Sequence, residues 1–155
     1  MSAQDPTAPL GPPLVGALLR MPGDVIRRRM LQALHDRGFT DIVPAHLALL
    51  RWPGPQGRRP TELALQTQMT KQAVNYLLGQ LEALGYLERR PASDDQRSRR
   101  VYLTSRGREA AETMREAVSE IETEWRTLLG HDDFEHLQAL LIRLNDRLVS
   151  TTRHR

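Results

Sequence analysis

Cysteine is absent from this chain of 155 residues. Its absence excludes disulfide bonds, thiolate catalysis, thiol-based redox sensing and cysteine-ligated zinc. The chain also lacks an apolar run near the roughly 18 residues that a membrane span needs. Its first residues, "MSAQDPTAPLGPP", lack the apolar core of a signal peptide. We therefore expect a soluble, cytoplasmic protein without a membrane partner.

Motifs for catalysis are missing as well. The sequence has no phosphate-binding glycine loop, nucleophile motif, paired-carboxylate site or His-Glu-x-x-His zinc motif. His131 and His136 stand five positions apart, and on a helix that spacing does not bring both imidazoles to one face. These absences predict a protein that is not an enzyme and that holds no metal or cofactor.

Lysine is nearly absent, because Lys71 is the only lysine among 22 basic residues. The net charge is +3 and the isoelectric point is about 9.9, which alone is a weak indicator of an anionic partner. The distribution is more informative, because residues 51–100 contain nine basic and five acidic side chains. This middle third therefore carries the whole basic excess and favours an anionic partner there.

Composition and periodicity divide the chain into three parts. Residues 1–13 contain four prolines and no apolar periodicity, so they are expected to form a flexible arm. Residues 14–149 are expected to form a single, mostly α-helical domain with a small two- or three-stranded β-wing, followed by a frayed tail at 150–155. The segment "MPGD" at 21–24 predicts a short helix, a kink and a longer helix.

Three helices are predicted in the middle of the chain. The first covers 44–52, and the second covers 61–68 with Thr61 as its cap. The third runs from Thr70 to Leu84, and Gly85 ends it.

A hairpin and further helices complete the pattern. Strands are predicted at 86–90 and 99–103, joined by a polar loop that contains Pro91. The rest is helical, and Asp132 with Glu135 resembles a capping box at the start of the last helix.

The helix that begins at Thr70 carries the first candidate site. Its apolar face is made by Val74, Leu77, Leu78, Leu81 and Leu84. The opposite face shows amide and phenol groups, with a lysine at its margin: Lys71, Gln72, Asn75, Tyr76 and Gly79. Such groups bind base edges and phosphates, and the helix N-terminus, capped by Thr70, favours a phosphate. The alternative is an ordinary amphipathic helix with a neutral, solvated face.

The neighbouring segments favour nucleic-acid binding. A short helix, the tight "QTQMT" connection with Met69 filling the turn, and the next helix make a helix-turn-helix. The basic hairpin that follows makes a wing, whose arginines would be attracted into a narrow minor groove. We therefore expect residues 44–104 to form a winged helix-turn-helix lobe that binds double-stranded DNA.

Three segments, "LALLRW", "RPTELALQTQMTKQAVNYLLGQLEALGYLERR" and "DDQRSRRVYLTSRGREAAETM", together resemble the multiple-antibiotic-resistance regulator (MarR) family of winged-helix transcription factors. The wing of that family carries Asp-x-Arg-x-x-Arg, which Asp95, Arg97 and Arg100 match. The resemblance implies that Arg97 inserts into the minor groove and that Asp95 orients an arginine at the base of the wing, for which Arg100 is the candidate. Arg99 remains as a backbone contact or a second probe.

A homodimer on a pseudo-palindromic operator is also implied by the resemblance, with half-sites about one turn of the duplex apart. Residues 14–38 and 105–149 would be the dimerisation helices, because they carry more apolar surface than a small lone domain needs. The expected interface residues are Leu14, Leu18, Trp125, Phe134, Leu137, Leu141, Leu144 and Leu148. The alternative is that these side chains only cover the core of one chain.

Regulators of this family often bind a small aromatic or anionic effector between the dimer helices and the DNA-binding lobe. Such an effector would act by differential affinity for two lobe spacings. The candidate cleft residues are His35, His46, Arg51 and Trp52. For each histidine the alternative is a satisfied structural role.

The sequence therefore predicts a homodimeric, sequence-specific DNA-binding regulator, in the first instance a repressor released by an effector. Activation stays open. The alternative is a winged-helix interaction module that does not bind DNA specifically.

Overall fold

The computed structural model describes residues 12–51, 53–92 and 98–152. Predictions for residues 1–11, Trp52, Asp95, Arg97 and residues 153–155 lie outside the described residues. The expected fold class is confirmed, because the chain is mostly helical with a two-stranded antiparallel sheet. The elements in chain order are α1 (Val15–Asp36), α2 (Pro44–Leu50), α3 (Pro60–Thr67), α4 (Lys71–Ala83), β1 (Leu87–Pro91), β2 (Arg99–Leu103), α5 (Ser105–Leu129) and α6 (His131–Thr152).

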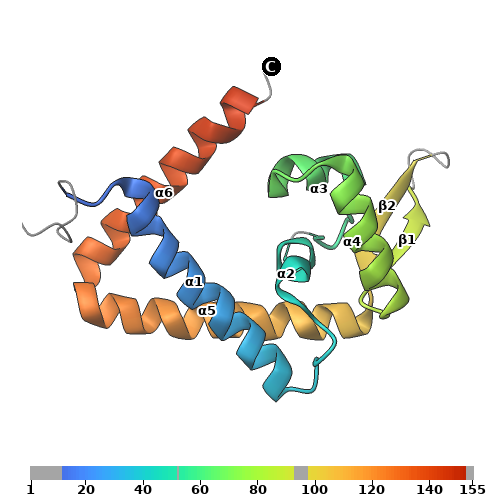
Figure 1. Cartoon of the computed structure of the whole chain (residues 1–155), viewed down its shortest axis with the longest axis horizontal. Helices are drawn as coiled ribbons and strands as arrows, with labels where there is room; N and C mark the ends of the chain where they lie inside the picture. Colours follow the sequence, from blue (N-terminus) through green and yellow to red (C-terminus); the bar gives the residue numbers. More distant parts are fainter. Residues whose placement is uncertain (1–11, 52, 93–97, 153–155) are drawn as a thin grey trace, which may run out of the picture.

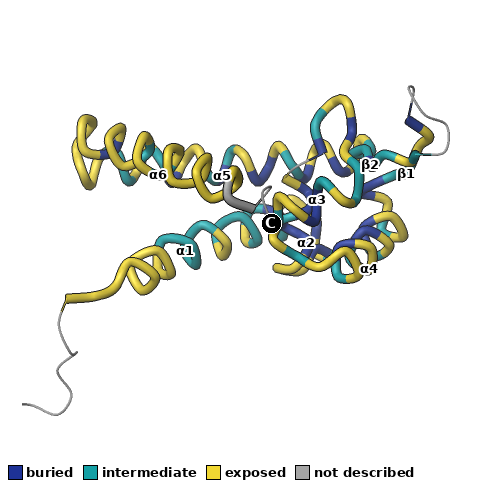
Figure 2. The backbone as a smooth tube through the Cα atoms, turned by 90° about the horizontal axis from the view of Figure 1, so that it is seen from above, coloured by how far each residue is buried: buried dark blue, intermediate teal, exposed yellow. Residues whose placement is uncertain are grey.

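The long helix α5 joins two parts of the molecule. Helices α2, α3 and α4 and the hairpin gather near its N-terminal end, α1 crosses it, and α6 leads away from its C-terminal end (Figure 1). The buried residues concentrate where α2, α3, α4 and the hairpin pack around the N-terminal end of α5, whereas α6 and the start of α1 are mostly exposed (Figure 2). Leucines from α1, α2, α3 and α4 form the centre of this core: Leu34, Leu49, Leu50, Leu63, Leu78 and Leu81.

Helix α1 is continuous, so the break predicted at "MPGD" is wrong. Pro22 lies inside the helix. A proline removes one helical hydrogen bond, which here leaves the carbonyl of Leu18 without its usual partner. Leu18 is 55% exposed, so water can satisfy that carbonyl. Further along, Arg29 pairs with Glu124 at 2.6 Å and anchors the helix to α5.

The helix-turn-helix forms where it was predicted, with a different cap on α3. The helix begins at Pro60, and the Glu62 carboxylate accepts the backbone N–H of Arg59 at 2.9 Å, so Thr61 is not the cap. A glutamate in the first turn can satisfy this donor and also favours the positive end of the helix. Gln68 takes a left-handed conformation, with φ of 55°, and turns the chain into α4.

The hairpin has the predicted position, but Pro91 belongs to β1 and pairs with Arg99 rather than lying in the loop. A proline is tolerated there because it stands at the end of a strand. A single bridge adds Arg58 beside Val101, with two backbone hydrogen bonds whose nitrogen-to-oxygen distances are 3.0 and 2.8 Å. The wing thus has two strands and one bridge from the loop before α3.

Helix α6 differs from its prediction at both ends. It begins at His131, directly after Gly130, so Asp132 lies within the first turn and is not a cap. Glu135 pairs with Arg126 of α5 at 3.3 Å instead of closing a capping box. The helix continues to Thr152, beyond the predicted start of a frayed tail.

Candidate nucleic-acid interface

Helix α4 separates its two faces as the sequence predicted. Val74, Leu78 and Leu81 are at most 1% exposed, while Leu77 and Leu84 are half-buried. The exposed face carries the predicted polar side chains: Lys71, Gln72, Asn75 and Tyr76, with Gly79 beside them. The arrangement exposes amide, ammonium and phenol groups of the kind that bind base edges and phosphates.

The start of α4 is also accessible. The Thr70 hydroxyl accepts the backbone N–H of Ala73 at 3.1 Å, which confirms the predicted cap. Thr70, Lys71 and Gln72 are exposed, so the positive end of the helix faces solvent. Half-buried Met69 packs against the core and seats the turn, as expected.

The described wing arginines have different surroundings. Arg99 is exposed at the start of β2, whereas Arg100 donates to the carbonyl of Gln56 at 3.4 Å. Arg89 pairs with Glu82 at 3.1 Å and so ties β1 to the end of α4. Arg100 therefore braces the loop before α3. The predicted pairing of Asp95 with Arg100 and the predicted minor-groove contact of Arg97 involve residues outside the described part of the chain.

A close contact between Gly57 and the Tyr102 ring, behind the wing, was not predicted from the sequence. Gly57 has φ of 67°, and a Cβ at this position would lie 2.7 Å from the Tyr102 ring. The Arg90 guanidinium stacks near the same ring, 5.2 Å from its centroid. This packing joins the loop before α3 to β2. The only sequence signal was Gly57 at the end of "PGPQG", which indicates a loop but does not show what packs against it.

A second missed cluster joins three segments at the start of α5. The hydroxyl of fully buried Tyr86 donates to Asp41, and Arg106 pairs with Asp41 at 2.9 Å. The Arg106 guanidinium also lies over the Tyr86 ring, 4.6 Å from its centroid. Burial, followed by the bond to Asp41, raises the pKa of Tyr86. The cluster fastens the α1–α2 loop, the root of the wing and α5 to one another.

His46 has a structural environment. It is 3% exposed, its Nδ1 accepts the backbone N–H of Val43 at 3.3 Å, and its Nε2 lies 3.1 Å from Gln80 Oε1. Both ring nitrogens are thus occupied inside the lobe, which matches the structural alternative for this residue. His35 is half-buried, with its Nε2 3.2 Å from the carbonyl of Ile42.

Arg51 lines a cavity of about 650 Å³ between α1, the end of α2, β2 and α5. Its apolar wall includes Met30, Pro53, Leu103, Met114 and Val118. Arg108 and Arg115 add positive charge, and a hydrogen bond from Arg115 lowers the pKa of Glu112. Neither predicted histidine lines this cavity, and Trp52 is outside the described residues.

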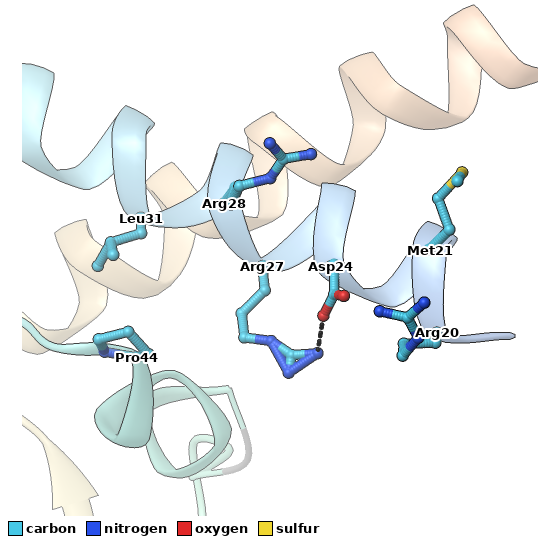
Figure 3. Close-up of a pocket in the computed structure, with 7 residues that line it drawn as sticks. All are labelled: Arg20, Met21, Asp24, Arg27, Arg28, Leu31 and Pro44. Carbon is cyan, nitrogen blue, oxygen red and sulfur yellow. Dashed lines mark hydrogen bonds and ion pairs between the residues drawn. The ribbon is translucent and has the colours of Figure 1, made fainter. Parts of the chain in front are cut away.

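A second hollow, of about 450 Å³, lies between α1 and the start of α2 (Figure 3). Arg20, Arg27 and Arg28 border it, and Arg27 pairs with Asp24 at 3.1 Å. Met21 and Leu31 are further lining residues.

The predicted interface residues differ in exposure. Leu14 is 81% exposed, and Leu18, Leu137, Leu144 and Leu148 are also exposed. Trp125 and Leu141 are half-buried. Phe134 is 2% exposed and lies beneath the Arg126 guanidinium, so a single chain already buries it between α5 and α6.

The tight α3–α4 turn, the exposed polar face of α4 and the following hairpin define a winged helix-turn-helix protein. The MarR family model matches residues 40–98. The structure of the Mycobacterium tuberculosis MarR family protein Rv2887 with salicylic acid is similar, at 28% identity over 87% of this chain and 98% of that chain, with a TM-score of 0.62. These findings support a MarR family winged-helix protein, and the members of that family are transcription regulators.

Two further structures share the fold. The reduced form of MarR from E. coli is 24% identical, covers 86% of this chain and 98% of its own, and has a TM-score of 0.68. The transcriptional repressor CouR, bound to a 23-mer DNA duplex, is 25% identical, covers 85% of this chain and 92% of its own, and has a TM-score of 0.64. A search of the curated proteins found no match. Within residues 12–51, 53–92 and 98–152, no helix is long and apolar enough to cross a membrane.

Proposed function

We propose that this protein is a homodimeric repressor that binds a pseudo-palindromic DNA operator and is released by a small effector. One observation carries the proposal. An exposed face with Lys71, Gln72, Asn75 and Tyr76 stands on a helix whose other side is buried in the core, so the face is held rigidly. Rigid polar groups on one helix face suit base-edge recognition in the major groove.

The wing contributes the second contact in this proposal. Arg99 would meet the phosphate backbone, while Arg97 would reach the minor groove and Asp95 would orient Arg100. The bridge between Arg58 and Val101 supports this role, because it ties the wing to the loop before α3. The wing and α4 can then bind as one body. The CouR structure with a DNA duplex supports DNA as the partner.

The dimer in this proposal uses the exposed leucines of α1 and α6. A monomer rarely leaves so many large apolar side chains exposed on two of its helices, and a two-fold partner would cover them. Phe134 would support this interface from beneath rather than contact the partner. Two lobes on one face of the duplex would then read two half-sites.

The cavity beside Arg51 is the proposed effector site. Its volume falls within the usual range for small ligands, and its apolar wall with flanking arginines suits a small aromatic acid. Salicylic acid in the Rv2887 structure supports this class of ligand. Because the cavity lies between α5 and the lobe, a ligand there could favour one lobe spacing over another. His35 and His46 would act only indirectly.

Binding to the DNA upstream of the protein's own gene, compared with scrambled DNA at two salt concentrations, tests the proposal. We expect tight, salt-dependent and sequence-selective binding, weakened by an aromatic acid such as salicylate. Equal, weak binding to both DNAs would contradict regulation at this site and favour the interaction module.

Arg97→Ala in the wing distinguishes a DNA-binding regulator from an interaction module that does not bind DNA specifically. Loss of DNA affinity is expected if Arg97 probes the minor groove. Unchanged affinity would show that the wing assignment is wrong. Arg143→Ala on α6, far from the proposed DNA face in sequence and fold, is the matched control.

A further inference from the structure

A chain of hydrogen bonds joins the buried His46 of α2 to the exposed face of α4. The backbone N–H of Val43 donates to His46 Nδ1, whose Nε2 lies 3.1 Å from Gln80 Oε1. Gln80 Nε2 in turn donates to the Tyr76 hydroxyl at 3.1 Å. His46 is 3% exposed and Tyr76 is 67% exposed, so the chain runs from the core to the surface.

The first bond determines the direction of the others. A backbone N–H can only donate, so His46 Nδ1 must accept and the neutral ring carries its proton on Nε2. That proton is donated to Gln80 Oε1, which turns the amide NH₂ group toward Tyr76. The Tyr76 oxygen therefore accepts a hydrogen bond, and its own hydrogen is left to donate outward.

We propose that Gln80, held by His46, is a positioning residue that makes Tyr76 an outward hydrogen-bond donor and thereby sets the base preference at one operator position. This inference rests on the proposed DNA-binding function. A phenol without an intramolecular partner can either donate or accept a hydrogen bond. The Tyr76 hydroxyl is instead oriented by Gln80, which buried His46 holds in place. Orientation before binding lowers the entropy lost when the contact forms.

The chemistry of the major groove indicates which bases this donor selects. Guanine offers N7 and O6, adenine offers N7, and thymine offers O4 as acceptors. Cytosine offers only its N4 amino donor, which would face the Tyr76 hydrogen without a bond. We therefore expect the base facing Tyr76 to be an acceptor-bearing base, with cytosine disfavoured.

Operator selection from randomised DNA tests the inference. Tyr76→Phe removes the donor, and Gln80→Leu removes the support while keeping a similar shape. Each is expected to weaken preference at the same base position by roughly two- to tenfold, the usual worth of one hydrogen bond. The double variant should be no weaker in preference than Tyr76→Phe alone, because the two residues act through one contact. Gln32→Leu, which removes a glutamine bonded to Asp36 on α1, is the control that should leave the preference unchanged.

Gln80→Glu gives a sharper test than loss of preference. A carboxylate would accept from both His46 and Tyr76, so the phenol hydrogen would turn inward and its oxygen would face the DNA as an acceptor. Preference at that position should then shift toward the bases whose amino groups donate in the major groove, which are cytosine and adenine, and away from guanine and thymine. A loss of affinity without this shift would overturn the proposed direction of the chain.

The histidine tautomer is measured without DNA. Nitrogen chemical shifts of the free, full-length protein should show His46 protonated at Nε2 and not at Nδ1. Protonation at Nδ1 would overturn the inference even if a variant failed to fold. Additive effects of Tyr76→Phe and Gln80→Leu, or effects at different bases, would overturn it while DNA binding stands. A wild-type chain without sequence selectivity would overturn both this inference and the proposed function.

Discussion

At the scale of single residues, Tyr86 lies where three segments meet. Its ring is fully buried, its hydroxyl donates to Asp41, and Arg106 covers the ring and pairs with the same carboxylate. A phenol suits this place because it combines a large apolar ring with one polar atom that reaches a charged acceptor. The α1–α2 loop, the wing and α5 therefore depend on one another through this side chain.

Tyr86→Phe should lower the free energy of unfolding by about 1–3 kcal/mol, because it keeps the ring but removes two hydrogen bonds of the hydroxyl, one donated to Asp41 and one accepted from Arg106. Urea unfolding at neutral pH measures the change. Tyr102→Phe is the matched control, since within the described part of the chain its ring packs on Gly57 but its hydroxyl makes no hydrogen bond. Equal stability of the two variants would show that the Asp41 bond contributes nothing.

The pH dependence of stability follows from the raised pKa of Tyr86, which burial and the Asp41 bond cause. Folding favours the neutral phenol, so this contribution is fully present below the unfolded value near 10 and is lost as pH rises through the folded value. The stability difference between wild type and Tyr86→Phe should therefore narrow above pH 10. A difference that stays constant through that range would contradict the assignment.

Lys71 and Asn75 should differ in how they affect DNA binding. Lys71→Ala is expected to weaken binding about equally on all DNA sequences and to reduce the salt slope by about 1, if the ammonium contacts a phosphate. Asn75→Ala should instead relax the preference at one base position, at a cost of roughly 1–3 kcal/mol. Titration against operator and scrambled DNA at several salt concentrations measures both effects. Unchanged preference in the Asn75 variant would exclude it as a base contact.

At the scale of elements, α4 could be predicted because its signals are local. The cap at Thr70, the apolar spacing and Gly85 all lie within one segment and agree with one another. The continuity of helix α1 could not be predicted, because the local segment "MPGD" indicates a break and the packing of α1 against the rest of the molecule overrides it. Pairs such as Arg29 with Glu124, 95 positions apart, favour a continuous α1 along α5 and are invisible to local patterns.

The junction of α5 with β1 gives a prediction at this scale. A Cβ on Gly107 would lie 2.0 Å from the carbonyl oxygen of Tyr86. Gly107→Ala must therefore push the first turn of α5 from the root of the wing, at a cost of about 1–3 kcal/mol or more. Gly79→Ala is the control, because nothing lies within 4 Å of a Cβ there and the helix should gain about 0.5–1 kcal/mol. Thermal unfolding measures both, and a Gly107 variant as stable as wild type would contradict the close packing.

At the scale of the whole molecule, the exposed leucines of α1 and α6 fit the interface of the proposed homodimer. Leu144→Glu should break the proposed dimer, since an unpaired charge buried at an apolar interface costs about 3 kcal/mol or more. Sedimentation should then show a monomer, and DNA affinity should fall because the half-sites are no longer bound together. Leu65→Glu, at an exposed position of α3, should remain dimeric. A dimeric Leu144 variant would place the interface elsewhere.

The fold class, the winged helix-turn-helix and the polar face of α4 could be predicted from the sequence alone. These features depend on periodicity, caps and turn residues, which act over a few neighbouring positions. The burial of Phe134, the hydrogen bonds of His46 with Val43 and Gln80, and the contacts of Tyr86 with Asp41 and Arg106 could be seen only in the folded chain. Such contacts join residues far apart along the chain, and their energies depend on burial and geometry that no local pattern contains.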